Sequence, residues 1–319
     1  MSPSVHGLHH ITCIAGDPQA NVDFYVGVLG LRLVKRSVNQ DAPDTYHLFY
    51  ADAAGSPGTD LTFFPWPRME PARRGIGLAV DVAFAVPSSS LPYWRARLAS
   101  ARVPVDAEAP ATRFGEPTLC FHDPDGLPLA LVGIDAARPY SPWDKSAVPA
   151  EHQIRGLHAV RLLERDMGPT VATLTTLLGM QPVGIEDGWH RFAAGEGGSG
   201  TLVDVKELPT ERRGTWGTGG IHHVAWRVAD MDQGLALRQI LDEAGLRPTP
   251  VIDRFWFESI YFKEPGGTLF ELATDGPGFG RDEDTAHLGE RLILPPWLEG
   301  QRATIEAGLP ALVVPAARD

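Results

Sequence analysis

The sequence has few cysteines and no long apolar run, and each absence excludes a class of protein. Cys13 and Cys120 are too few for a disulfide framework, and their spacing does not suggest a zinc site. No apolar stretch approaches the roughly 20 residues that a membrane-spanning helix needs. The first residues, MSPSVHGLHH, lack the basic and apolar regions of a secretory signal. We therefore expect a cytoplasmic protein with no membrane partner.

Basic residues are also scarce. The chain has 28 Lys and Arg against 40 Asp and Glu, which gives a net charge of −12. The arginines are scattered or form short pairs such as Arg73-Arg74. Because phosphate contacts need clustered basic side chains, we expect no nucleic-acid partner.

The residues that are abundant indicate a folded, β-rich protein. The 319 residues are 43% hydrophobic and include eight Trp and thirteen Phe, enough for a substantial core. A chain of this length favours two domains over one. The 34 Gly and 28 Pro imply many turns, which favours strands over a helical bundle.

One pattern occurs four times: a short strand, an amphipathic helix, then further strands. In the first copy Asp17 suits a helix N-cap and Gly30 can end that helix. Looking for such repeats first matters, because they decide the fold class. The pattern predicts an α+β fold of four βαβββ modules in two tandem domains. The four first strands are GLHHITCIA (7–15), GIGLAVDVAF (75–84), GLHAVRLLE (156–164) and GIHHVAWRV (220–228).

The spacing of the modules predicts where the chain divides. Three prolines between Asp135 and Gln153 indicate a linker, because proline-rich stretches interrupt regular elements. The tail after Asp275 is typical of a lid or a packing arm that ends in a short helix. The expected segments are an N-terminal pair of modules at 1–134, a linker at 135–154, a C-terminal pair at 155–275 and an arm at 276–319.

Three polar residues stand out when the modules are aligned. His10 and His223 occupy the fourth position of the first strand in modules one and four, where modules two and three have Leu78 and Ala159. Glu271 lies on the last strand of module four, within GGTLFEL. Two imidazoles and one carboxylate are typical of a non-haem Fe(II) site with open positions for substrate and O₂. The pattern predicts that His10, His223 and Glu271 bind a metal.

The residues aligned with Glu271 in the other modules carry less chemistry. They are Thr62, Ala130 and Asp204, and without a histidine at Ala159 we expect Asp204 to be solvated or structural. Strand alternation means that only one histidine of each HH pair can reach a shared metal. Four other histidines are assigned to structural or surface positions: His47, His122, His158 and His190.

The chain resembles the vicinal oxygen chelate superfamily, which comprises glyoxalases, bleomycin resistance proteins and dioxygenases. Within it, the chain is most similar to hydroquinone-type ring-cleaving dioxygenases. The likeness spans nearly the whole chain. It rests on the ordered motifs GLHHIT, YHLFYAD, TRFGEP, RPYSPW, RRGTWGTGGIHHVAW, FESIYFKEPGGTLFELATDGPGF and DEDTAHLGERLILPPWLE.

The resemblance implies the vicinal oxygen chelate fold and an Fe(II) ion held by the same three residues, with Mn or Zn an alternative in the isolated protein. O₂ would be the co-substrate and a small aromatic compound the substrate. It also implies that five further residues line the site: Tyr261, Arg254, His222, His9 and Thr12. Sequence leaves open whether Tyr261 or Ile260 lies opposite Glu271.

These features predict an extradiol-type dioxygenase that acts on a hydroquinone or a related dihydroxy-aromatic. His222 and Tyr261 are the candidate acids and bases, Arg254 would stabilise anionic oxygen, and Phe255 to Phe257 offer an aromatic wall. A glyoxalase-type lyase or isomerase is one alternative, although Thr62 replaces the further carboxylate that such enzymes usually have. A non-catalytic protein that binds an aromatic compound is the other. We also expect a homo-oligomer.

Overall fold

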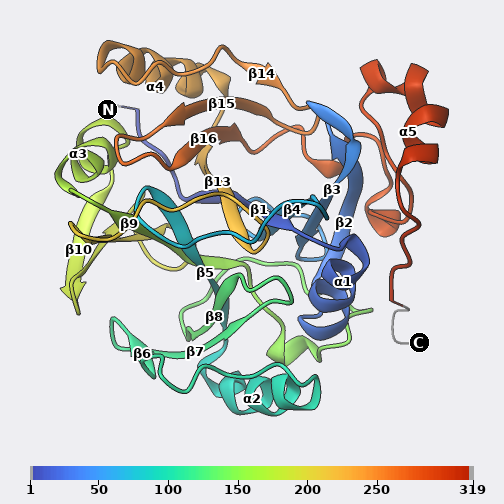
Figure 1. Cartoon of the computed structure of the whole chain (residues 1–319), viewed down its shortest axis with the longest axis horizontal. Coiled ribbons are helices and arrows are strands. Elements are labelled where there is room, and N and C mark those ends of the chain that lie inside the picture. The colour runs from blue at the N-terminus through green and yellow to red at the C-terminus, as the bar shows by residue number, and fades with distance from the viewer. Residues whose placement is uncertain (1–2, 316–319) are drawn as a thin grey trace.

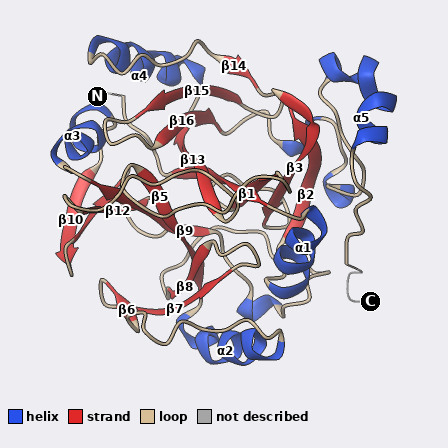
Figure 2. Cartoon of the chain, in the orientation of Figure 1, coloured by secondary structure: helices blue, strands red, loops and turns tan. Residues whose placement is uncertain are grey.

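Two curled eight-stranded sheets form the centre of the molecule (Figure 1). The computed structural model describes residues 3–315. The helices lie around the outside of the sheets (Figure 2). The α+β fold of four βαβββ modules that the repeats predict is confirmed. No helix within residues 3–315 is long and apolar enough to cross a membrane.

The first sheet combines module one with module four. Strands β1 and β13, from opposite ends of the chain, pair antiparallel at its centre, with Thr12 in register with His223. The two halves of the sequence therefore share this sheet. In spatial order its strands are β14 (Ile252–Asp253), β15 (Glu258–Lys263), β16 (Leu269–Thr274), β13 (Gly220–Val228), β1 (Leu8–Ala15), β4 (Asp60–Pro65), β3 (Ala42–Ala51) and β2 (Arg32–Asn39).

The second sheet combines modules two and three in the same way. Its central strands β5 and β9 pair antiparallel, with Asp81 in register with Arg161. A register shift between Ala79 and Asp81 interrupts this ladder. In spatial order the strands are β10 (Gln181–Glu186), β11 (Trp189–Ala193), β12 (Leu202–Glu207), β9 (Leu157–Glu164), β5 (Leu78–Val86), β8 (Pro128–Gly133), β7 (Glu116–His122) and β6 (Thr112–Arg113).

Each module carries one helix after its first strand. Asp17 caps the first helix as expected, because its side chain accepts a hydrogen bond from the backbone N–H of Ala20. Gly30 ends this segment at a φ of +71°, where a Cβ would meet Ser146 and Val148 at 2.6 Å. The helices are α1 (Pro18–Val22), continued by a π-helix (Asp23–Val28); α2 (Leu91–Ser100); α3 (Gly168–Ala172), continued by a π-helix (Thr173–Leu177); and α4 (Met231–Glu243).

Side chains along β1 alternate between the apolar core and the opposite, polar face of the sheet. Ile11 and Cys13 are fully buried in the main apolar cluster, while His10 and Thr12 face the concave side of the first sheet, as period-two geometry requires.

The residues after 275 pack against β2 and β3. Lys35 on β2 is fully buried and forms ion pairs with Asp282 and Glu283, and Arg32 donates to the backbone carbonyls of Thr285 and Ala286. These contacts hold the arm against the first sheet. It contains short 3₁₀ turns at Phe279–Arg281, Thr285–His287 and Pro296–Gln301, followed by α5 (Arg302–Gly308).

Candidate metal centre

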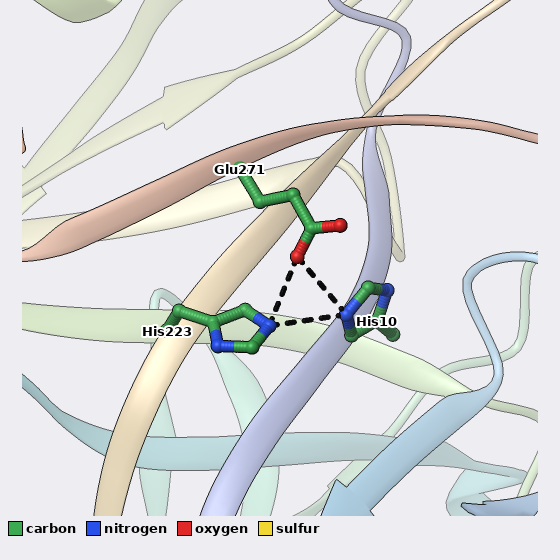
Figure 3. Close-up of side chains that lie close together, drawn as sticks. All are labelled: His10, His223 and Glu271. Carbon is green, nitrogen blue, oxygen red and sulfur yellow. Dashed lines mark hydrogen bonds and ion pairs between the residues drawn. The ribbon is translucent and has the colours of Figure 1, made fainter. Parts of the chain in front are cut away.

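Three buried side chains meet on the concave face of the first sheet. His10 comes from β1, His223 from β13 and Glu271 from β16. The Nε2 atoms of the two histidines lie 3.2 Å apart (Figure 3). Glu271 Oε2 lies 3.3 Å from Nε2 of His10 and 2.9 Å from Nε2 of His223. In the described part of the chain, this is the one group of three His, Cys, Asp or Glu side chains whose donor atoms lie within 4.8 Å of one another.

Strand register brings the three residues together. His10 pairs with Ala225 across β1 and β13, and Glu271 pairs with the same Ala225 across β13 and β16. His223 lies two residues before Ala225 and so projects from the same face. His10 and His223 lie 213 positions apart in the sequence. They meet because modules one and four share the sheet.

His9 orients His10 from outside the centre. His9 Nδ1 lies 2.8 Å from His10 Nδ1, and His9 Nε2 lies 3.1 Å from the carbonyl oxygen of Thr274. Because a carbonyl only accepts, His9 carries its proton on Nε2 and accepts from His10 at Nδ1. Burial, and then the charge of His10, lowers the pKa of His9 to about 3, which keeps the ring neutral. Nε2 of a neutral His10 therefore presents a lone pair to the centre.

His222 contacts His223 in the same way. Their Nδ1 atoms lie 2.8 Å apart, and the His222 ring stacks on Trp216 with centroids 4.6 Å apart. Burial, and then the charge of His223, lowers the pKa of His222 to about 3. The expectation that one histidine of each pair reaches the centre agrees with this geometry, since the Nε2 atoms that converge belong to His10 and His223.

Tyr261, and not Ile260, lies opposite Glu271 in the β15–β16 ladder. Its ring meets that of His223 edge-on at 5.6 Å, and its hydroxyl lies 3.3 Å from Nε of Arg254. Burial, and then the charge of Glu271, raises the pKa of Tyr261, so its hydroxyl stays protonated at neutral pH. Arg254 also pairs with Asp41 at 3.1 Å.

Thr12 lies on β1 two residues after His10, on the same face of the strand. Its hydroxyl hydrogen-bonds to that of Thr62 at 2.7 Å, and Thr62 in turn lies 2.9 Å from His47 Nε2. Of the five predicted lining residues, His222, Arg254 and Tyr261 border the cavity at the triad. His9 and Thr12 lie outside it, in contact with His10 and Thr62. The roles of all five stay predictions.

A cavity of about 310 Å³ opens onto the two histidines of the triad. Trp256 and Phe257 border it, whereas Phe255 packs behind them against Trp256. Apolar walls with a few polar groups are typical of a small-molecule site. The lining residues are His10, Asn39, Gln40, Asp41, His47, Phe49, Phe64, His222, His223, Arg254, Trp256, Phe257, Tyr261 and Leu269.

Two residues of this site were missed from the sequence. His47 was assigned to a structural or surface position, and its ring in fact borders the cavity. Strand alternation alone did not show which face of YHLFYAD it occupies. Ser259 is fully buried and donates a hydrogen bond to Glu271 Oε1, which orients the carboxylate. Its position two residues before Tyr261, on the same strand face, was the available signal.

The triad fits a divalent cation. Its two imidazole nitrogens and one carboxylate oxygen converge, and the buried Oε2 of Glu271 lies within 3.3 Å of Nε2 of both histidines. Burial raises the pKa of Glu271, but the charge of His10 and hydrogen bonds from both histidines outweigh it and hold this pKa well below its usual range. Metal ligands must be deprotonated, so a metal would bind here in competition with protons. Fe(II), Mn(II) and Zn(II) all accept this donor set.

The second sheet has ion pairs where the first has the triad. Asp81, and not Leu78, is the equivalent of His223, because it lies two residues before Ala83, which pairs with Ala130 as Ala225 pairs with Glu271. Counting from Gly75 selected Leu78, whereas the glycine that matches Gly219 is Gly77. Asp204 is buried, so the expectation of a solvated residue was wrong and the structural alternative holds. Three arginines neutralise the two carboxylates: Arg113 pairs with Asp81, and Arg161 and Arg191 pair with Asp204.

The comparisons with known proteins agree with the fold. The family model of the Glyoxalase/Bleomycin resistance protein/Dioxygenase superfamily matches residues 7–131 and 156–272. A crystal structure of a proposed dioxygenase from Bacillus subtilis has a TM-score of 0.91 at 39% identity and covers 98% of this chain and 99% of its own. Glyoxalase I from Zea mays, at 15% identity, covers 84% of this chain and 92% of its own with a TM-score of 0.61, which shows the fold alone.

Two relatives are similar over nearly the full length. MhqA of Bacillus subtilis, a proposed ring-cleaving dioxygenase, is 40% identical and covers 96% of this chain and 98% of its own. A chlorohydroquinone/hydroquinone 1,2-dioxygenase of Sphingobium indicum is 36% identical and covers 93% of both chains.

Proposed function

The chain belongs to the glyoxalase/bleomycin resistance protein/dioxygenase superfamily, and we propose that it is an Fe(II)-dependent dioxygenase that cleaves the ring of a hydroquinone or a related dihydroxy-aromatic. The observation that carries the proposal is the convergence of His10, His223 and Glu271 at the end of an aromatic-walled cavity. The names of the full-length relatives support ring cleavage by dioxygen.

His10, His223 and Glu271 would hold the iron. Bound there, Fe(II) supplies open coordination positions for a substrate oxygen and O₂, together with the electron transfer that makes their reaction feasible. His9 and Ser259 fix the orientation of two of the three ligands through the hydrogen bonds described above. Such outer contacts commonly change metal affinity by 10- to 100-fold.

The cavity suits one substituted benzene ring. Its aromatic wall comes from two directions, with Phe49 and Phe64 on the first module and Trp256 and Phe257 on the fourth. Offset or edge-on contacts with these rings would orient a flat substrate and exclude water.

His222 and Tyr261 are the candidate proton-exchanging groups beside the substrate. Burial keeps the His222 ring neutral, with a pKa of about 3, and the ring borders the cavity. The raised pKa of Tyr261 keeps its hydroxyl a donor. We assign Tyr261 to hydrogen-bond donation to the developing anion and keep His222 as a candidate acid or base.

Arg254 supports the donor role of Tyr261. Its guanidinium lies over the Tyr261 ring at 5.3 Å and donates toward the hydroxyl, so positive charge is held near any anionic oxygen at this end of the cavity. Thr12 would hold the neighbouring wall through Thr62.

The name of the Sphingobium relative gives 1,2-cleavage of hydroquinone, and the extradiol type stays our prediction for this chain. Hydroquinone carries its hydroxyls on carbons 1 and 4. A 1,2-cleavage therefore opens the bond between a hydroxylated carbon and its unsubstituted neighbour. Both atoms of O₂ would enter the product, leaving a carboxylic acid at one end and an aldehyde at the other.

Two alternatives use the same fold. A glyoxalase-type lyase or isomerase would isomerise a thiol adduct without O₂, but the first-module equivalent of Glu271 is Thr62, which offers no carboxylate. A binding protein for an aromatic compound would need the cavity and not the buried triad.

Anaerobic reconstitution with Fe(II) separates the three candidates. The proposal predicts O₂ uptake with hydroquinone or catechol, whereas the lyase predicts turnover of a methylglyoxal–thiol adduct without O₂. Binding of the phenols with neither reaction would identify a binding protein. The homo-oligomer stays a prediction, which light scattering coupled to size exclusion tests.

A further inference from the structure

His47 is a polar residue in the cavity that neither the triad nor the five predicted lining residues include. It lies on β3, and its ring packs between Phe49 and Phe64, with centroids 3.9 Å and 4.4 Å away. The stacking fixes the plane of the imidazole while one edge borders the cavity shared with His10 and His223. A histidine held this firmly presents its free nitrogen in one direction.

The two nitrogens of His47 differ in their contacts. Nε2 lies 2.9 Å from the hydroxyl of Thr62, which is itself tied to Thr12 at 2.7 Å. Nδ1 has no hydrogen-bond partner among residues 3–315. His47 is half-buried and its ring borders the cavity, so a ligand hydroxyl that bonds to Nδ1 gains affinity there.

Other polar groups at this end of the cavity are engaged in part. The Gln40 amide nitrogen donates to the carbonyl of Arg254, and the Arg254 guanidinium pairs with Asp41 and contacts the Tyr261 hydroxyl. The Oδ1 of Asn39 accepts from the backbone N–H of Asp41. The Asn39 amide nitrogen and the Gln40 Oε1 have no partner in the described part of the chain, so Asn39 and Gln40 are the rivals to His47.

The sheet order places His47 across the cavity from the triad. Strand β4 separates β3 from β1, and neighbouring strands are about 4.8 Å apart. The strand of His47 therefore lies two strand spacings, about 10 Å along the sheet, from the strand of His10. His10 of β1 and His47 of β3 nevertheless border the same cavity. A benzene ring with one oxygen at the triad has its opposite edge toward β3.

We propose that Nδ1 of His47 binds the second hydroxyl of a para-dihydroxybenzene, and that this contact selects hydroquinones over catechols. The second oxygen of a hydroquinone lies on the far side of the ring from the first, whereas that of a catechol stays beside the triad. A hydroxyl both donates and accepts, so it satisfies either tautomer of His47. The proposal rests on the proposed function for its substrate class, but it concerns binding and not turnover.

The test compares hydroquinone with phenol, which lacks the second hydroxyl. Calorimetry under anaerobic conditions, on full-length protein loaded with Fe(II), should give the wild type about tenfold higher affinity for hydroquinone, the order expected of one added hydrogen bond. His47→Phe keeps the aromatic packing. It should reduce the ratio of hydroquinone affinity to phenol affinity to about one, while the affinities for phenol and catechol change less than about twofold. If that variant fails to bind phenol, His47→Gln, which retains a polar end toward Thr62 but no atom at Nδ1, should give the same loss.

Two results would overturn the assignment. One is a hydroquinone-to-phenol affinity ratio that stays at the wild-type value in the His47 variants. The other is a hydroquinone-to-phenol affinity ratio that collapses in Asn39→Ala or Gln40→Ala and persists in His47→Phe, which would place the second hydroxyl at the β2–β3 turn. O₂ uptake by the wild type is measured separately. Loss of the ratio in His47→Phe without any wild-type O₂ uptake would support the binding assignment and refute the dioxygenase proposal.

Discussion

Divalent metal should stabilise the wild-type chain, and His10→Ala should abolish that stabilisation. The ligands come from both ends of the sequence, so unfolding separates His10 from His223 and Glu271 and destroys the site. A ligand that binds only the folded state raises the free energy of unfolding by mass action. The variant keeps two of the three donors, and it keeps β1, whose other contacts are apolar.

The size of the effect follows from general thermodynamics. Free metal at about 100 times its Kd adds about 2.7 kcal/mol to the free energy of unfolding. The entropy of unfolding is about 2.1 cal/mol/K per residue, or about 0.7 kcal/mol/K for 319 residues. The melting temperature of the wild type should therefore rise by about 4 °C. In His10→Ala the rise should fall below about 1 °C at the same metal concentration.

Differential scanning calorimetry under anaerobic conditions, with and without Fe(II), measures both shifts. His158→Ala is the matched control, since His158 is a buried histidine of module three that hydrogen-bonds to Glu116 and Ser199 and lies outside the triad. It should keep the full metal-dependent rise even if its metal-free melting temperature drops. A full rise in His10→Ala, or an equal loss in His158→Ala, would refute the assignment of the triad.

Three further predictions concern single side chains. Burial, and then the charge of Glu264, raises the pKa of Glu164 to about 8. This group should therefore cost the wild type about 1.4 kcal/mol of stability per pH unit as the pH rises from about 4.5, its unfolded pKa, to about 8. Glu164→Gln removes this loss, so urea unfolding should find the variant more stable than the wild type at pH 8 but not at pH 4.5. Lys35→Met leaves the buried carboxylate of Glu283 unpaired and should cost about 3 to 5 kcal/mol, visible as a lower melting temperature. Ser259→Ala removes the hydroxyl that orients the triad carboxylate and should weaken metal affinity about 10- to 100-fold in a chelator competition assay.

Exposed positions supply the controls for two of these changes. Glu196→Gln should leave the pH dependence unaltered, and Lys145→Met should leave the melting temperature within about 1 °C of the wild type. A Glu164→Gln curve parallel to the wild type would show that this carboxyl is not destabilised by burial. A Lys35→Met melting temperature equal to that of Lys145→Met would contradict the account of the C-terminal arm, and unchanged metal affinity in Ser259→Ala would show that the hydroxyl does not orient Glu271.

The sequence allowed the triad to be predicted because its members break a local rule. A histidine or glutamate on an apolar strand is costly unless something binds it, and the repeats supplied the positions where Leu, Ala or Thr stands instead. The module pattern likewise predicted the fold, since helix caps such as Asp17 and stop glycines such as Gly30 act locally.

Non-local features were not accessible in the same way. Which modules share a sheet depends on pairing between strands more than 200 residues apart, as for β1 and β13. Module two has glycines at both 75 and 77, and counting from Gly75 selected Leu78 where the strand pairing selects Asp81. The burial of Asp204 depends on Arg161 and Arg191, which lie on different strands. Strand alternation gives two faces for His47 but does not say which of them meets the cavity.

The central claim is that this chain opens the ring of a dihydroxy-aromatic with both atoms of O₂. Fe(II)-loaded protein mixed with hydroquinone and ¹⁸O₂, followed by mass spectrometry, tests it most directly. The account predicts one O₂ consumed per hydroquinone and two ¹⁸O atoms in a ring-opened product, both lost in Glu271→Gln. Uptake of O₂ that yields only unlabelled benzoquinone, or no uptake across a panel of para- and ortho-dihydroxybenzenes, would contradict it.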